Sequence, residues 1–334
     1  MITKYNKLLS PHKLRKKIKL DKLCRKVKIA NDETVKNIID GQDKRFLIVC
    51  GPCSADNTDA VLDFCEKLKA LHIKIKDKIF LMPRVYTAKA RSTGDGYLGM
   101  MFQPDGDVID IKRGVSAARR MLASCIAKTG LPLAEELLYG EQVSYNSDLI
   151  SYYFLGARQS DSPYFRNIAS ALDVAVGVKN DLSGDLTCLA GSIHAVTTPK
   201  TFIYNGLEIT TSGNRYSHGV LRGSIDAEGR FYRNCEQKDV DKLREECAAL
   251  NIDNDFVMVD CSHANSGKCA VNQIRNAINA VKNTDVRGIM LESYIHGGTA
   301  QNEYGVSKTD ECLDWDSTEK LIYELYDLLP AVNQ

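Results

Sequence analysis

Two cysteines stand three residues apart at the end of an apolar run, in the stretch "FLIVCGPCSADN" (46–57). Cys50 and Cys53 could form a redox pair, supply half of a zinc site, or serve only as packing. A disulfide oxidoreductase carries C-x-x-C at the start of a helix in a much smaller fold, which argues against the first alternative. The choice between the others depends on which residues the fold brings to Cys53.

Other residues that could take part in binding or catalysis stand at the end of short apolar runs or just after them. One group is cationic: Arg84, Lys89, Arg91, Arg158, Lys179 and Arg222. A second group mixes a thiol, an imidazole and carboxylates: Cys53, His263, Glu292 and Asp310. Phosphates and carboxylates are the natural ligands of the first group. The second group suits a divalent metal such as Mn²⁺, Fe²⁺, Co²⁺ or Zn²⁺, although spacing alone leaves a structural salt-bridge network as an equal alternative.

The apolar runs alternate with amphipathic stretches of helical period. Eight of them are candidate strands, at 45–50, 79–85, 131–137, 153–158, 174–179, 200–205, 256–261 and 288–293. Most are apolar throughout, as in parallel strands covered on both faces. Eight strands alternating with helices predict an α/β fold, a (β/α)₈ TIM barrel, whose enzymes carry their chemistry at the C-terminal ends of the strands.

We expect residues 1–40 to form an N-terminal extension and residues 41–334 to form the barrel domain. A polar, Gly-rich segment at 206–235 predicts a small extra β-hairpin after strand six. Eleven Lys or Arg and one acid lie between Lys4 and Lys28. A solvated helical extension that packs on the barrel or on a neighbouring subunit is favoured here over a nucleic-acid arm.

The overall composition is that of a globular protein, with 44% apolar and 26% charged residues among 334. The net charge of +1 gives no reason to expect nucleic acid or an anionic membrane as a partner. No window approaches the roughly 18 apolar residues of a membrane span, and the N-terminus lacks a secretory apolar core. Most of the 11 cysteines are scattered singly, which predicts reduced thiols and a cytoplasmic protein.

A set of motifs, taken together in their order, resembles class I 3-deoxy-D-arabino-heptulosonate 7-phosphate (DAHP) synthases, in particular the larger subtype with an N-terminal extension. The motifs cover nearly the whole chain: "GPCS" (51–54), "RVY" and "KARST" (84–93), "GAR" (156–158), "VGVKN" (176–180), "TSGN" (211–214), "LRG" (221–223), "DCSHANS" (260–266), "ESY" (292–294) and "YGVSKTDECLDW" (304–315).

The resemblance implies a barrel enzyme that condenses phosphoenolpyruvate with erythrose 4-phosphate, the first step of the shikimate pathway, with one divalent metal and a homodimeric or homotetrameric assembly. It implies the metal ligands Cys53, His263, Glu292 and Asp310. It implies phosphoenolpyruvate contacts from Arg84, Lys89, Arg158, Lys179 and Arg222, with Glu136 nearby. Arg91 and Ser92 would meet the aldose phosphate. Lys89 would protonate the new alkoxide, and His263 could assist while ligating the metal with Cys53.

Departures from the family pattern concern the acceptor side and the regulatory region. On the acceptor side, Ala90 stands where the lysine–proline–arginine–threonine signature has proline, and Tyr294 where histidine is often found. The segment 201–214 is shorter than in close relatives and has Tyr204 where a small hydroxyl residue is common. These departures leave open a paralogous synthase that uses a different aldose phosphate in specialised metabolism. In the regulatory region, changes at 139–145 and Asp173 predict insensitivity to phenylalanine and tyrosine. The remaining alternatives are an octulosonate phosphate synthase that takes arabinose 5-phosphate and a catalytically silent regulatory or binding paralogue.

Overall fold

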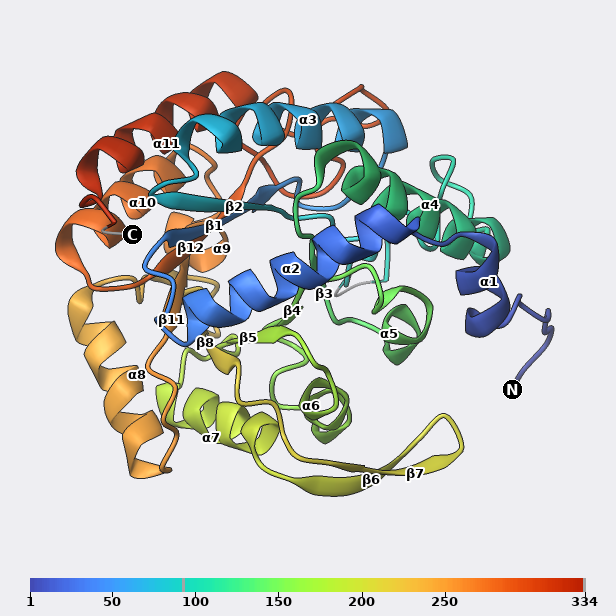
Figure 1. Ribbon diagram of the computed structural model, residues 1–334, viewed down its shortest axis with the longest axis horizontal. Helices are drawn as coiled ribbons and strands as arrows, with labels where there is room; N and C mark the ends of the chain where they lie inside the picture. The colour runs from blue at the N-terminus through green and yellow to red at the C-terminus, as the bar shows by residue number, and fades with distance from the viewer. Residues whose placement is uncertain (92–93, 333–334) are drawn as a thin grey trace.

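The computed structural model describes residues 1–91 and 94–332, and its centre is a ring of eight parallel strands (Figure 1). In chain order the strands are β1 (Phe46–Gly51), β2 (Ile79–Pro83), β3 (Ala134–Glu136), β4 (Tyr152–Leu155), β5 (Ala175–Lys179), β8 (Ser217–Leu221), β11 (Val257–Asp260) and β12 (Gly288–Glu292). The hydrogen-bonded order runs β2-β1-β12-β11-β8-β5-β4-β3, and a parallel bridge between Arg84 and Ala134 joins its two ends. The predicted (β/α)₈ barrel is confirmed.

Helices cover the outside of this ring. They are α3 (Thr58–Ile75), α4 (Ile111–Thr129), α5 (Gly140–Asn146), α6 (Pro163–Ser170), α7 (Leu186–Thr197), α8 (Gln237–Ala249), α10 (Asn272–Asn283) and α11 (Trp315–Leu328), with the short α9 (His263–Ser266) at the rim. Side-chain caps define where several of them begin. Asn57 accepts hydrogen bonds from the backbone of Asp59 and Ala60 at the start of α3. Gly130, with φ of 69°, ends α4 in a left-handed turn.

Apolar side chains of β1 and its neighbours face these helices, and a second apolar cluster fills the barrel interior. The interior cluster also contains Val35, Ile38 and Ile39 of α2 (Lys22–Ile39), each at most 1% exposed. Figure 1 shows α2 lying across one end of the ring, and α1 (Pro11–Lys17) beside α5. The extension therefore packs on the barrel, as one of the two sequence alternatives held. The division of the chain at residue 40 stays a prediction.

The candidate strand at 200–205 is a strand, but it lies outside the barrel. Lys200–Tyr204 (β6) pairs antiparallel with Leu207–Thr211 (β7). β6 alternates between half-buried and exposed positions, and β7 is mostly exposed. The sixth barrel strand is instead β8, "SHGVL", which is buried at every position. A second two-stranded pair, β9 (Ser224–Ile225) and β10 (Phe231–Tyr232), follows it. A barrel strand is covered on both faces, and β6 is not.

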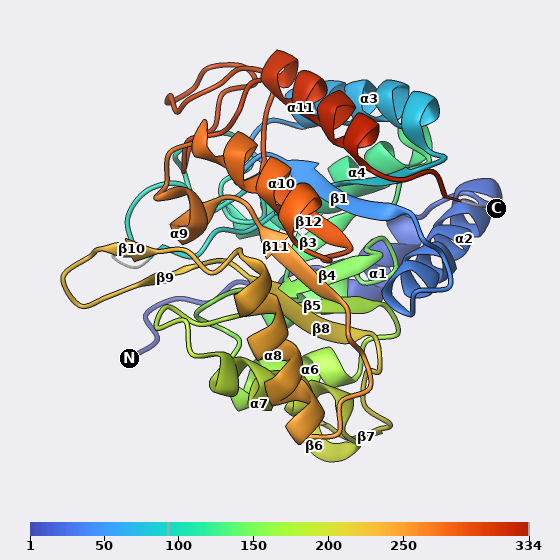
Figure 2. The same cartoon turned by 90° about the vertical axis from the view of Figure 1, so that its left-hand side faces the viewer.

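Long loops gather on one side of the ring in Figure 2, on the side of α9 and the β9–β10 pair, while α2 lies on the opposite side. The loop side corresponds to the C-terminal ends of the barrel strands, where Lys179 and Glu292 close β5 and β12. None of the helices within 1–91 and 94–332 combines the length and the hydrophobicity of a membrane-spanning segment.

Candidate active site

A cavity of about 270 Å³ opens at the C-terminal rim of the barrel. The loops and strand ends around the ring converge on it, as parallel strands in a barrel require. Its lining includes eight of the predicted site residues: Lys89, Arg91, Glu136, Arg158, Lys179, Arg222, His263 and Asp310. Cys53, Arg84 and Glu292 lie beneath this lining and are at most 2% exposed. Ser92 lies outside the described residues.

Positive charge dominates the side of the cavity formed by β3, β4, β5 and β8. Lys179 ends β5 and donates a hydrogen bond to Oδ2 of Asp260 over 2.8 Å. Arg222 directly follows β8 and is 4% exposed. Burial lowers the pKa of Arg222, and the positive charge of Arg158 acts in the same direction. A buried guanidinium beside a second one is stabilised by an anionic ligand, so this wall of the cavity can hold a phosphate or carboxylate.

Arg84 takes a different position from the other cations. It lies under the cavity with Nη2 2.7 Å from Oε1 of Glu292, and its guanidinium stacks 3.9 Å from the ring centre of Tyr86. Its Nη2 also donates to the backbone oxygen of Cys53. The structure thus places Arg84 against the second chemical group rather than in the cavity lining.

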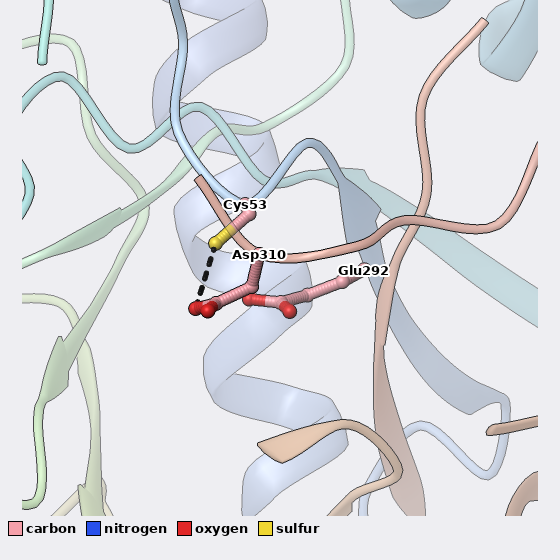
Figure 3. Close-up of side chains that lie close together, drawn as sticks. All are labelled: Cys53, Glu292 and Asp310. Atoms are coloured by element: carbon pink, nitrogen blue, oxygen red, sulfur yellow. Dashed lines mark hydrogen bonds between the residues drawn. The ribbon is translucent and has the colours of Figure 1, made fainter. Parts of the chain in front are cut away.

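The thiol and the carboxylates of that second group lie together (Figure 3). Ligand atoms of Cys53, Glu292 and Asp310 are all within 4.8 Å of one another. Sγ of Cys53 lies 3.4 Å from Oδ2 of Asp310, the contact marked in Figure 3. Lys89 reaches the same place from the β2–α4 loop, with Nζ 2.8 Å from the sulfur and 3.2 Å from Oδ2 of Asp310. The cluster joins segments more than 250 residues apart.

His263 approaches the cluster from α9. Its Nε2 lies 3.7 Å from Oε1 of Glu292, and its Nδ1 lies 2.9 Å from Oδ2 of Asp260. Because an ionised carboxylate only accepts hydrogen bonds, Nδ1 is placed to donate to Asp260, and Nε2 faces Glu292 at the longer distance. The backbone of His263 has a φ of 52°, a left-handed conformation that is uncommon for a non-glycine residue and is enriched at functional sites.

The charges in the cluster are mutually balanced. Burial would raise the pKa values of Glu292 and Asp310, but Arg84 and Lys89 respectively, together with His263, hold both carboxyls below their usual range. Burial also works to lower the pKa of Lys89, but its contacts with Cys53 and Asp310 outweigh burial and raise that pKa. Burial and the charge of Glu292 raise the pKa of the Cys53 thiol to about 11.

The donor set fits a divalent metal ion. One sulfur and two carboxylates, with an imidazole nitrogen beside them, are ligands of borderline transition metals. Oε1 of Glu292 is buried and accepts no hydrogen bond of good geometry within the described residues, although Arg84 lies close to it. A buried oxygen without a well-aligned donor is rare in native proteins, and a cation at this point would satisfy it.

Comparison with known proteins decides the family. The profile of the DAHP synthetase I family matches residues 25–322. This chain belongs to that family. It is 33% identical to the Tyr-sensitive phospho-2-dehydro-3-deoxyheptonate aldolase of Escherichia coli (strain K12), over 97% of this chain and 94% of the relative. It is 30% identical to the tyrosine-inhibited enzyme of Candida albicans, over 96% and 91% of the two chains.

A solved structure agrees with this assignment. The phospho-2-dehydro-3-deoxyheptonate aldolase from Francisella tularensis SCHU S4 superposes with a TM-score of 0.92 at 30% identity, and the alignment covers 100% of both chains. The predicted membership of the DAHP synthases is therefore confirmed. The family is generally dependent on a divalent metal, and the Cys53, Glu292 and Asp310 cluster offers a place for one.

Two residues of the site were absent from the predicted set. Asp260, fully buried, contacts both Lys179 and His263 and so joins the cationic wall to the cluster. It ends β11, and an acid at the end of the apolar run "FVMVD" was the available signal. Lys268 lines the cavity with its Nζ 3.8 Å from Oδ1 of Asp310. It lies on a loop after α9, where no pattern distinguishes it from other surface lysines.

Proposed function

We propose that this protein condenses phosphoenolpyruvate with erythrose 4-phosphate to give DAHP and inorganic phosphate, the first step of the shikimate pathway. Membership of the DAHP synthetase I family supports this activity. The single structural observation that carries it is the contact of Lys89 with both Cys53 and Asp310 at the edge of the cationic cavity. That contact supports a proton-donor role for Lys89, between the proposed anion-binding wall and the candidate metal site.

Phosphoenolpyruvate is assigned to the cationic wall. Its phosphate and carboxylate match Arg158, Lys179 and Arg222, and Glu136 borders the same space. Lys89, from the cavity lining, and Arg84, from beneath it, complete the proposed set of phosphoenolpyruvate contacts. Arg91, at the outer part of the cavity, together with Ser92, is assigned to the phosphate of the aldose. Bringing two dianionic substrates together in a shielded site removes the repulsion and the entropy loss that they would meet in water.

The proposed metal ligands are Cys53, His263, Glu292 and Asp310, and the ion is Mn²⁺, Fe²⁺, Co²⁺ or Zn²⁺. When bound, such an ion would supply Lewis-acid polarisation of the aldehyde oxygen of the aldose. Asp260 orients His263 so that Nε2 faces the site, and Arg84 offsets the charge of Glu292.

Lys89 is the proposed proton donor. C3 of phosphoenolpyruvate attacks the aldehyde carbon of the aldose, the aldehyde oxygen becomes an alkoxide, and Nζ of Lys89 gives it a proton. Positive charge develops at C2, water adds there, and the proton that this water loses can restore the ammonium of Lys89. The hemiketal phosphate then releases inorganic phosphate by C–O cleavage. The raised pKa of Lys89 keeps its ammonium protonated before the reaction begins, and the strongly basic alkoxide takes that proton.

A second candidate differs only in the acceptor. Ala90 lines the cavity next to Arg91, at the place where the family signature has a proline. A more flexible backbone beside the aldose phosphate favours a paralogous synthase that takes a different aldose phosphate.

The test is phosphate release from phosphoenolpyruvate with erythrose 4-phosphate, arabinose 5-phosphate or ribose 5-phosphate, each with and without EDTA. We expect the highest kcat/KM with erythrose 4-phosphate and loss of activity with EDTA that added Mn²⁺ restores. Lys89→Met should abolish turnover, whereas Lys320→Met, on α11 away from the cavity, should not. A preference for another aldose would establish the paralogue, and no release with any of them would contradict both candidates.

The assembly and location belong to the same proposal. A homodimer or homotetramer in the cytoplasm is the expected form. Size-exclusion chromatography with light scattering would measure the subunit count directly, and a monomer at micromolar concentration would contradict it.

A further inference from the structure

Tyr294 contacts all three segments that carry the Cys53, Glu292 and Asp310 cluster. It follows Glu292 by two residues, beyond the end of β12. Its backbone N–H donates to the carbonyl oxygen of Leu313, in the loop that carries Asp310. Its hydroxyl donates to Oδ1 of Asp56 over 2.9 Å, in the loop that carries Cys53. Because β1 and β12 have already ended here, side-chain contacts such as this one join the segments.

The cluster needs such a connection. Its carboxylates and thiol come from loops that lie beyond the strand ladders, and the charges of Glu292 and Asp310 repel each other at these separations. Backbone bonds hold part of the arrangement, with Ser293 N donating to Gly51 O over 3.0 Å. Beyond Cys53 a backbone bond from Ala55 N to the carbonyl oxygen of Tyr86 holds the loop to the segment after β2. The hydroxyl of Tyr294 joins the same loop, at Asp56, to the segment of Glu292.

The contact is built into the core rather than formed at the surface. Tyr294 is 0% exposed and Asp56 is 6% exposed. The ring of Tyr294 packs edge-on against Phe64 of α3, with ring centres 6.1 Å apart. Because packing fixes the ring of this buried tyrosine, its hydroxyl has little freedom to move. The hydrogen bond from the hydroxyl therefore restricts the position of the Asp56 side chain. Ser54 and Thr309 make a parallel contact between the same loops, with their hydroxyl oxygens 3.2 Å apart.

We propose that Tyr294 is a positioning residue that sets the separation of Cys53 from Glu292 and Asp310 by holding Asp56. This inference rests on the proposed metal site. The hydroxyl acts through Asp56 and the 53–57 loop and touches neither substrate nor metal. Its role is to keep the sulfur within reach of an ion bound by the two carboxylates, so that binding requires no rearrangement of the loop.

The test is the affinity of chelator-treated protein for Mn²⁺ alone, measured by calorimetric titration. Tyr294→Phe keeps the packing on Phe64 and removes only the hydroxyl. We expect its dissociation constant for Mn²⁺ to rise about tenfold, the lower end of the range for partners behind metal ligands. The KM for phosphoenolpyruvate should stay within about twofold of wild type, because the cationic wall is unchanged.

Ser293→Ala is the matched control. Ser293 precedes Tyr294 and its buried hydroxyl bonds to Thr318 over 2.6 Å, but this bond reaches α11 and not the loop of Cys53. The control should lose thermal stability as Tyr294→Phe does while its Mn²⁺ affinity stays within about twofold of wild type. Asp56→Ala should weaken Mn²⁺ binding as Tyr294→Phe does, and the double variant should be no weaker than either single variant, because both remove one contact.

Asp56→Asn provides a conservative rescue and a second route if Tyr294→Phe fails to fold. It keeps an acceptor oxygen for the hydroxyl, and its Mn²⁺ affinity should lie closer to wild type than that of Asp56→Ala. Wild-type Mn²⁺ affinity in both Tyr294→Phe and Asp56→Ala would overturn the inference while leaving the metal site intact. Absence of Mn²⁺, Zn²⁺, Co²⁺ and Fe²⁺ binding by the wild type would instead overturn the metal site itself.

Discussion

Nδ1 of His263 lies 2.9 Å from Oδ2 of Asp260, and this one carboxylate oxygen is also the acceptor for Lys179. Asp260 is fully buried at the end of β11, between the anion-binding wall and the proposed metal site. Charge on Asp260 is therefore shared by a residue assigned to phosphoenolpyruvate and a residue assigned to the metal. Coupling between the phosphoenolpyruvate site and the metal site would pass through this oxygen.

Asp260→Asn should reduce both metal affinity and kcat. An amide keeps the shape of the side chain but can present its NH₂ group to Nδ1, which favours the wrong tautomer of His263 and leaves Lys179 without its counter-charge. We expect a loss of about 10- to 100-fold in metal affinity or activity. Steady-state kinetics and Mn²⁺ titration measure it. Asp255→Asn, an exposed acid two residues before β11, is the control, and equal behaviour of the two variants would contradict the assignment.

Metal affinity should rise with pH. Burial and the charge of Glu292 raise the pKa of the Cys53 thiol to about 11, so the thiol is protonated at neutral pH and must lose its proton to bind a metal. Below that pKa the thiol contributes a gain in apparent affinity of about tenfold per pH unit. Competition with a chelator at pH 6.5, 7.5 and 8.5, corrected for the chelator's own protonation, measures the slope.

Cys53→Ser is the control for that slope, because an alcohol does not supply a thiolate. Its metal affinity should be low and should depend less steeply on pH. A wild-type slope equal to that of Cys53→Ser would show that the thiol is not a ligand.

Stability should decrease on acidification through the range of His218. This histidine is buried in the barrel interior, with Nε2 bonded to the hydroxyl of Tyr152, and burial lowers its pKa to about 3. In the unfolded chain a histidine titrates near 6.5. Between these values the unfolded state binds a proton that the native state does not, so the free energy of unfolding falls as pH falls from about 6.5 toward 3.

His218→Gln should flatten this dependence by up to about 1.4 kcal/mol per pH unit. The measurement is urea unfolding at several pH values from 7 to 4.5, comparing slopes rather than absolute stabilities, since any substitution of a buried residue lowers stability. The exposed His194→Gln should keep the wild-type slope. An unchanged slope in His218→Gln would refute the assignment.

Phenylalanine or tyrosine at sub-millimolar concentration should leave the rate unchanged. A cavity of about 530 Å³ lies between α2, α5, α6 and the β6–β7 hairpin, with Tyr204 and Asp173 in its lining. The hydroxyl of Tyr204 donates to the carbonyl oxygen of Gly140 over 2.7 Å and so ties the hairpin to α5. Lys28 and Asp32 in the same lining already pair with each other at 2.6 Å, which leaves their charges less available to an amino-acid ligand.

Initial rates over a titration of each amino acid measure this prediction. Tryptophan is tested in the same way as a third amino acid. The Tyr204→Ser substitution would open the cavity and so tests whether Tyr204 causes the insensitivity. A large fall in the wild-type rate with phenylalanine or tyrosine would show that the cavity binds an effector in spite of these contacts.

Much of the rim could be predicted from strand ends. Parallel strands in a closed ring bring their C-terminal residues to one face, so Glu136, Lys179 and Glu292 converge whatever the loops do. This rule located the cavity without knowledge of any long-range contact. It left Arg84 undetermined, because whether a cation faces the open cavity or a buried carboxylate depends on Glu292, which lies 208 positions away in the chain.

The sixth barrel strand could not be predicted in the same way. "SHGVL" opens with a serine and a histidine, which are typical of a loop, whereas "KTFIYN" has the composition of a strand. His218 is accommodated inside the barrel because Tyr152, from β4, bonds to it. Local composition does not indicate that His218 has Tyr152 as a buried partner. It also does not indicate that β6 lacks a second covering layer.

The position of α2 has a practical consequence for shortened forms of the protein. The interior side chains of the barrel strands pack at one end against Val35, Ile38 and Ile39 of α2. A form that starts at residue 41 would lack this contact and would expose a continuous apolar surface to water. It should therefore aggregate, even though every residue assigned to catalysis is still present. The first forty residues are thus as necessary to the catalyst as the strands that bear its chemistry.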